Sequence, residues 1–326
     1  MSHPAPFHLR WPYPQMFVVQ HRRILFQPVA KNACSSLKTL MVDLSDLPES
    51  EKETIRRNVH KATDRGSTGL QVKDYGEEEI RAIFADRGYF RFAVVREPFD
   101  RLVSAYLEKF VTNRRGKVQH VATGPVIAAV RGLEAPSQKD HARGITFREF
   151  VEHVTDQPFH RLDPHWRPQS DYFRVIPFDH LYGVEDLDML QHDLSLHCGE
   201  PISVPHRNRS RETKLERVAG VADMMPAQLE ARAKGLSSES FAEPDLVERV
   251  ARHFGSDATL FRAATAAQEA RRRALRAEAA LGGAVAADRA EAARVTLPGP
   301  RMRRLRKALS LNGLRRAAGL PPVPRR

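Results

Sequence analysis

The sequence predicts an α/β domain in which helices flank a central, mainly parallel β-sheet. One apolar strand, Ile24–Val29, runs through a short polar loop into a helix that begins at Ser35. A second, Phe90–Val95, turns at Arg96 into a helix whose first turn holds Pro98. An almost unbroken apolar run of this kind is typical of a parallel strand covered on both faces. Such sheets bind ligands at the carboxyl ends of their strands, so we expect both loops at one edge.

The N-terminal third supplies the first strand pair and several helices. Residues 1–15 are expected to form a loose lead-in, followed by a strand at Met16–Gln20 that pairs with Ile24–Val29. Ser35 and Ser36 are the type of residue that caps a helix, and this helix should end near Asp43. Charged helical stretches are predicted at about 50–60 and 77–86.

The rest of the chain alternates helices with less regular stretches. The helix after Pro98 carries a core-facing stripe that leaves Ser104 outside it. Mixed charge and several glycines predict a loop-rich insertion over 112–145. The later predicted elements are a helix from the capping box Thr146/Glu149 to Val154, a strand at Phe173–Phe178, a helix at Glu185–Leu196, a helix opened by Pro244, and a solvated helix over Arg262–Arg294.

Length and charge bound the organisation of the chain. With 326 residues and 41% hydrophobic composition, it can bury one substantial core, and we expect one domain, residues 16–262. Residues 297–326 hold nine Lys or Arg and no acid, which leaves +3 of the net +12 for the remainder. We therefore predict that residues 263–326 form an Ala/Arg-rich helix and a basic tail. That tail is expected to be disordered, or to lie on an anionic membrane surface through an apolar edge.

Cysteine content and the N-terminus bear on location. The two cysteines, Cys34 and Cys198, make no disulfide framework and no C-x-x-C metal spacing, which favours a reducing compartment. Met1–Met16 has no apolar run long enough for a signal peptide or membrane anchor. We therefore expect a soluble cytoplasmic protein, peripheral at the membrane if the tail binds there. Zinc-knuckle and RNP sequences are absent, so charge alone does not make nucleic acid a partner.

Both strand-to-helix loops have the chemistry of anion sites. The start of a helix presents free N–H groups and a partial positive charge, to which Lys31 adds a full charge in the first loop. In the second, Arg96 supplies a planar donor fork and Ser104 a hydroxyl, which together suit one phosphate. The sequence contains neither G-x-G-x-x-G nor G-x-x-x-x-G-K-[ST], so the loops are not those of a dinucleotide enzyme or an NTPase.

Four blocks carry a resemblance to a known family. Pro28–Lys38 (PVAKNACSSLK) and Val95–Tyr106 (VREPFDRLVSAY) resemble the 5′-phosphosulfate and 3′-phosphate motifs of sulfotransferases that use 3′-phosphoadenosine 5′-phosphosulfate (PAPS). Asp163–Ser170 resembles the H-W-x-P-Q segment of the carbohydrate sulfotransferase family 2, and Ile176–Glu185 resembles the strand and helix that follow it. The resemblance implies a P-loop-NTPase-like sulfotransferase fold. It also implies PAPS as donor and sulfuryl transfer to a hydroxyl of a carbohydrate or glycolipid acceptor. We expect no metal, because the sequence shows no metal-ligand set and lysine and arginine can stabilise the charge.

The resemblance assigns roles to residues of the two loops. Lys31 would act on the bridging oxygen of the donor, while the donor's 5′ end would be held by Asn32, Ala33, Cys34, Ser35 and Ser36. Arg96 and Ser104 would hold the 3′-phosphate, with Arg207 and Arg209 as two further guanidinium groups that could approach it. Because the chain is rich in Ala and Arg and lacks an anchor, the resemblance further suggests a bacterial enzyme.

The catalytic base and the acceptor contacts are less specific. A histidine suits the base because its neutral form exists at working pH. His60 lies between the two donor motifs, where several family members place their catalytic histidine, and we place it ahead of His165 of the H-W-x-P-Q block. Trp166 is either a wall for a sugar ring or core filling, and Arg167 and Gln169 are candidate polar contacts to the acceptor.

Two other functions remain open from the sequence. A nucleotide-dependent phosphotransferase could use a related fold, although the Walker lysine is missing. A non-catalytic protein that binds anionic glycans or membranes could also keep the fold and its basic tail. Binding of 3′-phosphoadenosine 5′-phosphate (PAP) in preference to ATP would separate the sulfotransferase from both.

Overall fold

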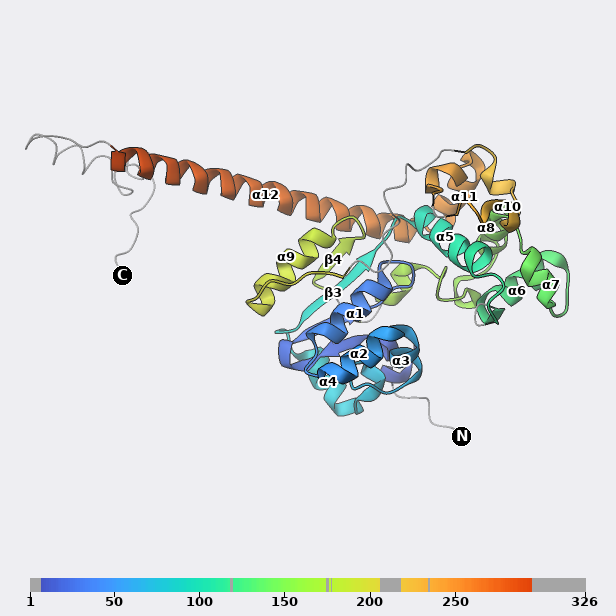
Figure 1. Ribbon diagram of the computed structural model, residues 1–326, viewed down its shortest axis with the longest axis horizontal. Coiled ribbons are helices and arrows are strands. Elements are labelled where there is room, and N and C mark those ends of the chain that lie inside the picture. Colours follow the sequence, from blue (N-terminus) through green and yellow to red (C-terminus); the bar gives the residue numbers. More distant parts are fainter. Residues whose placement is uncertain are drawn as a thin grey trace, which may run out of the picture. The chain divides into compact units, whose positions relative to one another are not determined.

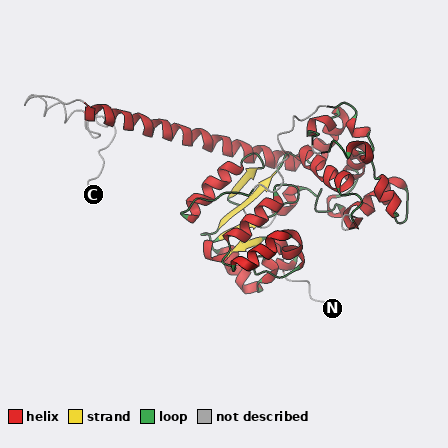
Figure 2. Ribbon diagram, in the orientation of Figure 1, coloured by secondary structure: helices red, strands yellow, loops and turns green. Residues whose placement is uncertain are grey.

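The computed structural model of the chain describes residues 7–117, 120–173, 176, 178–205, 218–233 and 235–294. It confirms the α/β prediction: four strands form one sheet, and helices make up most of the rest (Figures 1 and 2). The strands are β1 (Phe17–Val19), β2 (Ile24–Gln27), β3 (Phe90–Val95) and β4 (His180–Gly183). The helices include α1 (Cys34–Leu44), α2 (Glu49–Arg57), α3 (Val59–Arg65), α4 (Glu77–Ala85), α5 (Pro98–Tyr106), α8 (Phe147–Thr155), α9 (Leu187–Cys198), α10 (Pro226–Leu229) and α11 (Pro244–His253).

The sheet has the order β1-β2-β3-β4 and is parallel except at one edge. β1 pairs antiparallel with β2, which confirms the predicted hairpin. β2 pairs parallel with β3, and β3 pairs parallel with β4. Gln27 lies opposite Ala93, and Val95 opposite Gly183, so the carboxyl ends of β2, β3 and β4 lie close together. Both predicted anion loops therefore leave the sheet from neighbouring strands at the same end.

Side chains on the two faces of the sheet enter different apolar clusters. On one face, Phe26, Phe92 and Val94 pack with residues of α1 and α9, such as Leu37 and Leu190. On the other face of the hairpin, the alternate positions Val18 and Leu25 pack with Ile80 and Ile83 of α4. Burial on both faces explains why β3 is apolar at every position except Arg91.

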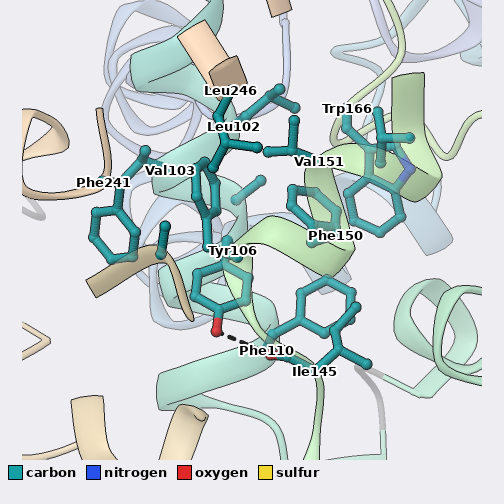
Figure 3. Packing of buried hydrophobic residues seen from close by; sticks show 14 of the residues in the cluster. Leu102, Val103, Tyr106, Phe110, Ile145, Phe150, Val151, Trp166, Phe241 and Leu246 are labelled. Carbon is teal, nitrogen blue, oxygen red and sulfur yellow. Dashed lines mark hydrogen bonds between the residues drawn. The ribbon is translucent and has the colours of Figure 1, made fainter. Parts of the chain in front are cut away.

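A third apolar cluster is built by helices away from the sheet, and it includes α5, the helix that follows the second anion loop. Residues of α5, α8 and α11 meet there around Tyr106, Phe150 and Leu246 (Figure 3). The Tyr106 hydroxyl donates a hydrogen bond to the Ile145 carbonyl at 2.9 Å, so its buried oxygen is satisfied. The predicted capping box forms, with Thr146 and Glu149 bonding each other's backbone at the start of α8.

The predicted loop-rich insertion over 112–145 is wrong, because most of its described residues are helical. A π-helical turn, Leu107–Thr112, continues α5, and α6 (His120–Arg131) and α7 (Gln138–Arg143) follow. Mixed charge and several glycines indicated loops, yet α6 forms with both a glycine and Pro125 inside it. Burial of Ala122, Val126 and Ile127 on one side of α6 outweighs the poor helix propensity of its sequence.

Two more predictions need correction. The strand expected at Phe173–Phe178 does not form over the described residues there, since Phe173 ends a 3₁₀ turn and the strand begins only at His180. The lead-in, expected to be loose, forms short turns from Phe7 onward. His8 and Tyr13 are buried there, so packing orders a segment whose sequence shows no periodicity.

The last described element is α12 (Gly255–Arg294), which agrees with the predicted helix although it begins earlier. Its first part is anchored to the sheet, where Gln268 donates to the Leu181 carbonyl at 2.9 Å. The chain divides into two units, Met1–Glu269 and Ala270–Arg326, and the site lies within the first. In the part of the chain that is described, every helix is too short or too polar to cross a membrane. The basic tail from residue 295 lies outside the described residues.

Candidate functional site

The loop between β2 and α1, here called the Lys31 loop (Pro28–Ala33), has a strained backbone. Lys31 and Ala33 both take left-handed conformations, with φ of 74° and 55°. For residues with a Cβ, this conformation costs on the order of 1–3 kcal/mol, and such residues cluster at functional sites. Left-handed residues in such a turn help to gather N–H groups into an anion-binding concavity.

The start of α1 differs from the prediction in one respect. Ala33, rather than a serine, is the N-cap, and Cys34 is the first helical residue, so Ser35 and Ser36 lie in the first turn and do not cap it. Their N–H groups, with that of Cys34, belong to the first turn, whose donors have no partner within the helix. The Asn32 N–H, expected to face the donor, instead bonds the Val29 carbonyl at 3.2 Å. Burial raises the pKa of the Cys34 thiol, which keeps it neutral.

The ammonium of Lys31 lies against an acidic side chain from the π-helical turn. It pairs with Glu108, whose other carboxylate oxygen lies 2.9 Å from the Lys109 ammonium. The Lys31 side chain is only 13% exposed. Burial lowers the pKa of Lys31, while the attraction of Glu108 works against that shift.

The second loop, here called the Arg96 corner (Arg96–Glu97), lies beside the Lys31 loop. Arg96 Nη1 is 3.4 Å from the Lys31 carbonyl oxygen. Its Nε is buried and has no hydrogen-bond partner among the described residues. Burial lowers the pKa of Arg96, against the attraction of Asp100 and Glu185. The corner thus holds a desolvated guanidinium with an unused donor, which suits an anion.

Ser104 and Glu97 complete the description of this corner. Glu97 caps α5 by accepting from the Asp100 N–H at 2.8 Å, and Pro98 takes the first helical position as predicted. Ser104 is half-buried on α5 between fully buried neighbours, in agreement with its expected place off the core stripe. Its pairing with Arg96 around one phosphate stays a prediction.

Gln169 links the two loops. Its Oε1 accepts from Asn32 Nδ2 at 2.6 Å and from the Arg96 N–H at 2.9 Å, and its Nε2 donates to the Arg96 carbonyl at 2.8 Å. Asn32 Nδ2 also donates to the Val94 carbonyl at 2.9 Å. Asp257 accepts from the Gln169 N–H at 2.7 Å, which ties α12 into the same network. Gln169, predicted as an acceptor contact, is fully buried and serves instead to hold the loops together.

Arg101 makes a second link to the same block of sequence. This arginine of α5 is 2% exposed, and it donates to the carbonyls of Ala30 at 3.0 Å, Pro164 at 3.1 Å and Arg167 at 2.8 Å. One buried cation therefore joins the Lys31 loop to the H-W-x-P-Q block by charge-assisted hydrogen bonds.

His60 of α3 borders the first turn of α1. Its Nε2 is 2.8 Å from Ser35 Oγ, and its Nδ1 is 3.5 Å from Asp64 Oδ2. Asp64 also pairs with the buried Lys38. Burial acts to raise the pKa of Asp64, but hydrogen bonds from His60 and Lys38 hold it well below its usual range. The histidine thus has an ionised carboxylate on one side and the Lys31 loop region on the other.

His165 has a carboxylate partner of its own. Asp163 accepts from the His165 N–H at 2.9 Å and lies 2.6 Å from its Nδ1, which leaves Nε2 on the far side of the ring. Burial raises the pKa of Asp163, and the bond to His165 more than reverses that shift. The structure therefore presents two histidines, each oriented by an acid, and neither prediction for the base is excluded by it.

The remaining predicted residues divide between packing and regions outside the description. Trp166 is 2% exposed and packs edge-on against Phe150 with ring centroids 5.3 Å apart, which supports core filling over a sugar wall (Figure 3). Arg167 donates to the Phe159 carbonyl at 3.1 Å and stacks on Trp11. Arg207 and Arg209 lie outside the described residues.

Several residues of the site escaped the sequence reasoning. Asp64 is four residues after His60, a helical spacing that could have indicated the pair. Arg101 belongs to the second motif, and its place among apolar helix residues could have indicated a buried cation. Glu108 gives no such signal, because its partner Lys31 is 77 residues away and only the fold brings them together.

Comparison with known proteins agrees with this geometry. The model of the sulfotransferase family matches residues 14–262, which is more than half of the chain. Human carbohydrate sulfotransferase 14 is 31% identical over 153 residues, covering 47% of this chain and 38% of that protein. Human carbohydrate sulfotransferase 10 is 31% identical over 150 residues, 45% of this chain and 39% of that protein. Mouse carbohydrate sulfotransferase 8 is 29% identical over 156 residues, 47% of this chain and 35% of that protein.

These matches span well under half the length of the relatives, and no solved structure matches the chain significantly. The family match, in contrast, includes the Lys31 loop, the Arg96 corner and the block that joins them. It ends within α12, after the contacts of Asp257. Because the family pattern runs through the sheet and through both loops, the chain belongs to the sulfotransferase family.

Proposed function

We propose that the protein transfers a sulfuryl group from PAPS to a hydroxyl of a carbohydrate acceptor. The observation that carries this proposal is the junction of the two loops, in which Gln169 bonds both Asn32 and Arg96. It brings two cationic groups, far apart in sequence, to the ends of adjacent parallel strands. The family match and the names of the carbohydrate sulfotransferases it resembles support the reaction class and the acceptor class.

The residues present fit a donor with an anionic group at each end. The first turn of α1 and Lys31 would hold the 5′-phosphosulfate, since both the helix dipole and the ammonium favour negative charge there. Arg96, with its unused buried Nε, would hold the 3′-phosphate together with Ser104. The donor supplies an activated sulfuryl group on a phosphate leaving group.

The chain's own residues would then perform two tasks. Lys31 would stabilise the negative charge on the bridging oxygen as the bond from sulfur to that oxygen breaks and PAP leaves. A histidine would take the hydroxyl proton as the acceptor oxygen bonds to sulfur. Alignment of the reactants in the loops would supply much of the acceleration, as in phosphoryl transfer.

We propose His60 as the base, with His165 as the competing candidate. With Nδ1–H directed at Asp64, His60 Nε2 would be an acceptor next to Ser35, at the edge of the proposed 5′ site. An acceptor hydroxyl would replace the Ser35 hydroxyl as the group that donates to Nε2. The orienting carboxylate is the arrangement expected of a general base.

A donor-binding experiment tests the first half of the proposal. PAP and ATP are titrated against the full chain by calorimetry, with Arg96→Gln as the test variant and Arg87→Gln, an exposed arginine, as its control. We expect PAP to bind the wild type and the control alike, and at least about tenfold more weakly to Arg96→Gln. Preference for ATP would support a phosphotransferase, and binding of neither nucleotide would refute donor use.

An acceptor screen tests the second half. Labelled PAPS is incubated with a panel of polysaccharides and glycolipids, and label transfer is measured for the wild type and for Lys31→Ala, His60→Ala and His165→Ala. The exposed residues Lys61 and His192 provide the alanine controls. Loss of about 10²-fold or more in kcat is expected for Lys31→Ala and for the base. A Lys31→Ala variant as active as wild type would remove the mechanism.

A further inference from the structure

The buried Lys31 ammonium contacts one carboxylate and lies near two other cations. Lys109 lies beside it across Glu108, Arg96 lies beside the loop that carries it, and the neutral Cys34 thiol is nearby. Glu108 is the acid in contact with Lys31 among the described residues. A buried ammonium in such surroundings tends to lose its proton, because both desolvation and like charges disfavour the charged form.

Glu108 is positioned by an unusual piece of backbone. It lies in the π-helical turn Leu107–Thr112 that directly continues α5, the helix that begins at the Arg96 corner. Such wide turns are rare and occur often at functional sites. Here the turn carries Glu108 and Lys109 in succession, and the Glu108 carboxylate joins the ammonium groups of Lys31 and Lys109.

We propose that Glu108 is a positioning residue whose carboxylate keeps the buried Lys31 ammonium charged and directed within the loop until the donor binds. This inference rests on the proposed function, because it assumes that Lys31 acts on the donor. In the donor-free protein, the Glu108 carboxylate is the counter-ion of the Lys31 ammonium. When the anionic donor binds, it replaces Glu108 as that counter-ion. Lys109 holds the carboxylate when Lys31 turns to the donor.

Glu108 is unsuited to the alternative role of general base. Burial alone would raise its pKa, but Lys31 and Lys109 outweigh burial and bring the pKa down to about 2. A carboxylate so strongly stabilised in its ionised form is a weak proton acceptor. Its geometry agrees, since both of its oxygens face ammonium groups.

The test measures the charge of Lys31 without using catalysis. The full-length chain is labelled with a trace of acetic anhydride at a series of pH values, and acetylation of the Lys31 peptide is read by mass spectrometry. Because only the neutral amine reacts, the midpoint reports where Lys31 loses its proton. We expect the midpoint to fall by about 1–3 pH units in Glu108→Gln. It should not move in Glu134→Gln, which changes an exposed carboxylate.

A second variant gives a shift of opposite sign. Removing the like charge in Lys109→Gln leaves Glu108 to pair with Lys31 alone, so the Lys31 midpoint should rise. This variant tests the inference even if Glu108→Gln does not fold. An unchanged midpoint in a folded Glu108→Gln, or a fall in Lys109→Gln, would overturn the inference.

The readout separates this inference from the proposed function. If no acceptor is sulfated but the Lys31 midpoint moves as expected, the counter-ion role stands and the assigned reaction fails. If the enzyme is active, the alkaline limb of kcat/KM should shift to lower pH in Glu108→Gln by the same amount as the labelling midpoint. A fall in kcat that is equal at every pH, with the labelling midpoint unmoved, would contradict the positioning role.

Discussion

The Gln169 side chain engages both backbone polar groups of Arg96. Its Oε1 accepts from the Arg96 N–H at 2.9 Å, and its Nε2 donates to the Arg96 carbonyl at 2.8 Å. The same Oε1 accepts from Asn32, so one amide fixes the Arg96 corner relative to the Lys31 loop. Any ligand that bridges the two loops depends on this amide for their spacing.

Replacing Gln169 with leucine should therefore weaken both the fold and the donor site. The change leaves the partly buried N–H and carbonyl of Arg96 without this partner, at a cost of up to about 1–3 kcal/mol each. We expect the free energy of unfolding to fall by about 2–4 kcal/mol and PAP to bind more weakly. Denaturant titration and calorimetry measure the two effects, with the exposed Gln138→Leu as control. Wild-type PAP affinity in a destabilised variant would show that the loops are not coupled through Gln169.

Arg101 should not tolerate even a conservative substitution by lysine. Its guanidinium serves three carbonyls in different directions, which a lysine ammonium cannot reach together. Arg101→Lys should lower the free energy of unfolding by about 2–4 kcal/mol, although the charge is kept. The exposed Arg115→Lys is the control and should change stability by less than about 0.5 kcal/mol. If the two variants are equally stable, Arg101 does not stabilise the fold by joining the Lys31 loop to the H-W-x-P-Q block.

Trp166 tests whether the aromatic side chain is core or sugar platform. Because its ring packs against Phe150, Trp166→Phe should cost about 1 kcal/mol and Trp166→Ala about 3–5 kcal/mol of unfolding free energy. If the side chain only packs, Trp166→Phe should leave the KM for the acceptor unchanged. A large rise in KM with unchanged stability would restore the sugar-binding role.

Local patterns sufficed to predict the sheet and its loops. The apolar run of β3, the hairpin before Gln27 and the Pro98 helix start each depend on neighbours in sequence, and the structure confirms all three. The adjacency of the two loops followed from the parallel sheet, because parallel strands place their carboxyl ends together. This adjacency can be predicted from the sheet alone, without knowing any side-chain contact.

What the sequence did not predict depends on distant contacts. The role of Gln169 requires Asn32, which is 137 residues away, and Glu108 reaches Lys31 across 77 residues. Helix α6 was missed because mixed charge and several glycines indicate loops, whereas burial of Val126 and Ile127 stabilises the helix. The serines of α1 were predicted to cap it, but the left-handed Ala33 takes the N-cap position.

Acid should reveal the strength of the Glu108 pairing. Its pKa is about 2 in the folded chain against an ordinary 4.5, so the pairing contributes stability above about pH 4.5. That contribution is lost as pH falls toward 2, because over this range the unfolded state takes up a proton at Glu108 that the folded state binds only weakly. The difference in unfolding free energy between wild type and Glu108→Gln should shrink over this range in urea titrations. A difference that stays constant from pH 5 to about pH 2 would mean the pair adds no pH-dependent stability.

The two histidine–carboxylate pairs provide matched variants for identifying the base. Asp64→Asn removes the charge beside His60, and Asp163→Asn removes the one beside His165. The true base should lose its orientation and its stabilised imidazolium, so kcat falls by at least about tenfold in one variant only. Measuring kcat alongside thermal unfolding separates this effect from lost stability, because Asp64 also pairs with the buried Lys38. If Asp163→Asn loses kcat while Asp64→Asn keeps it, the base is His165, and His60 serves only to support the start of α1.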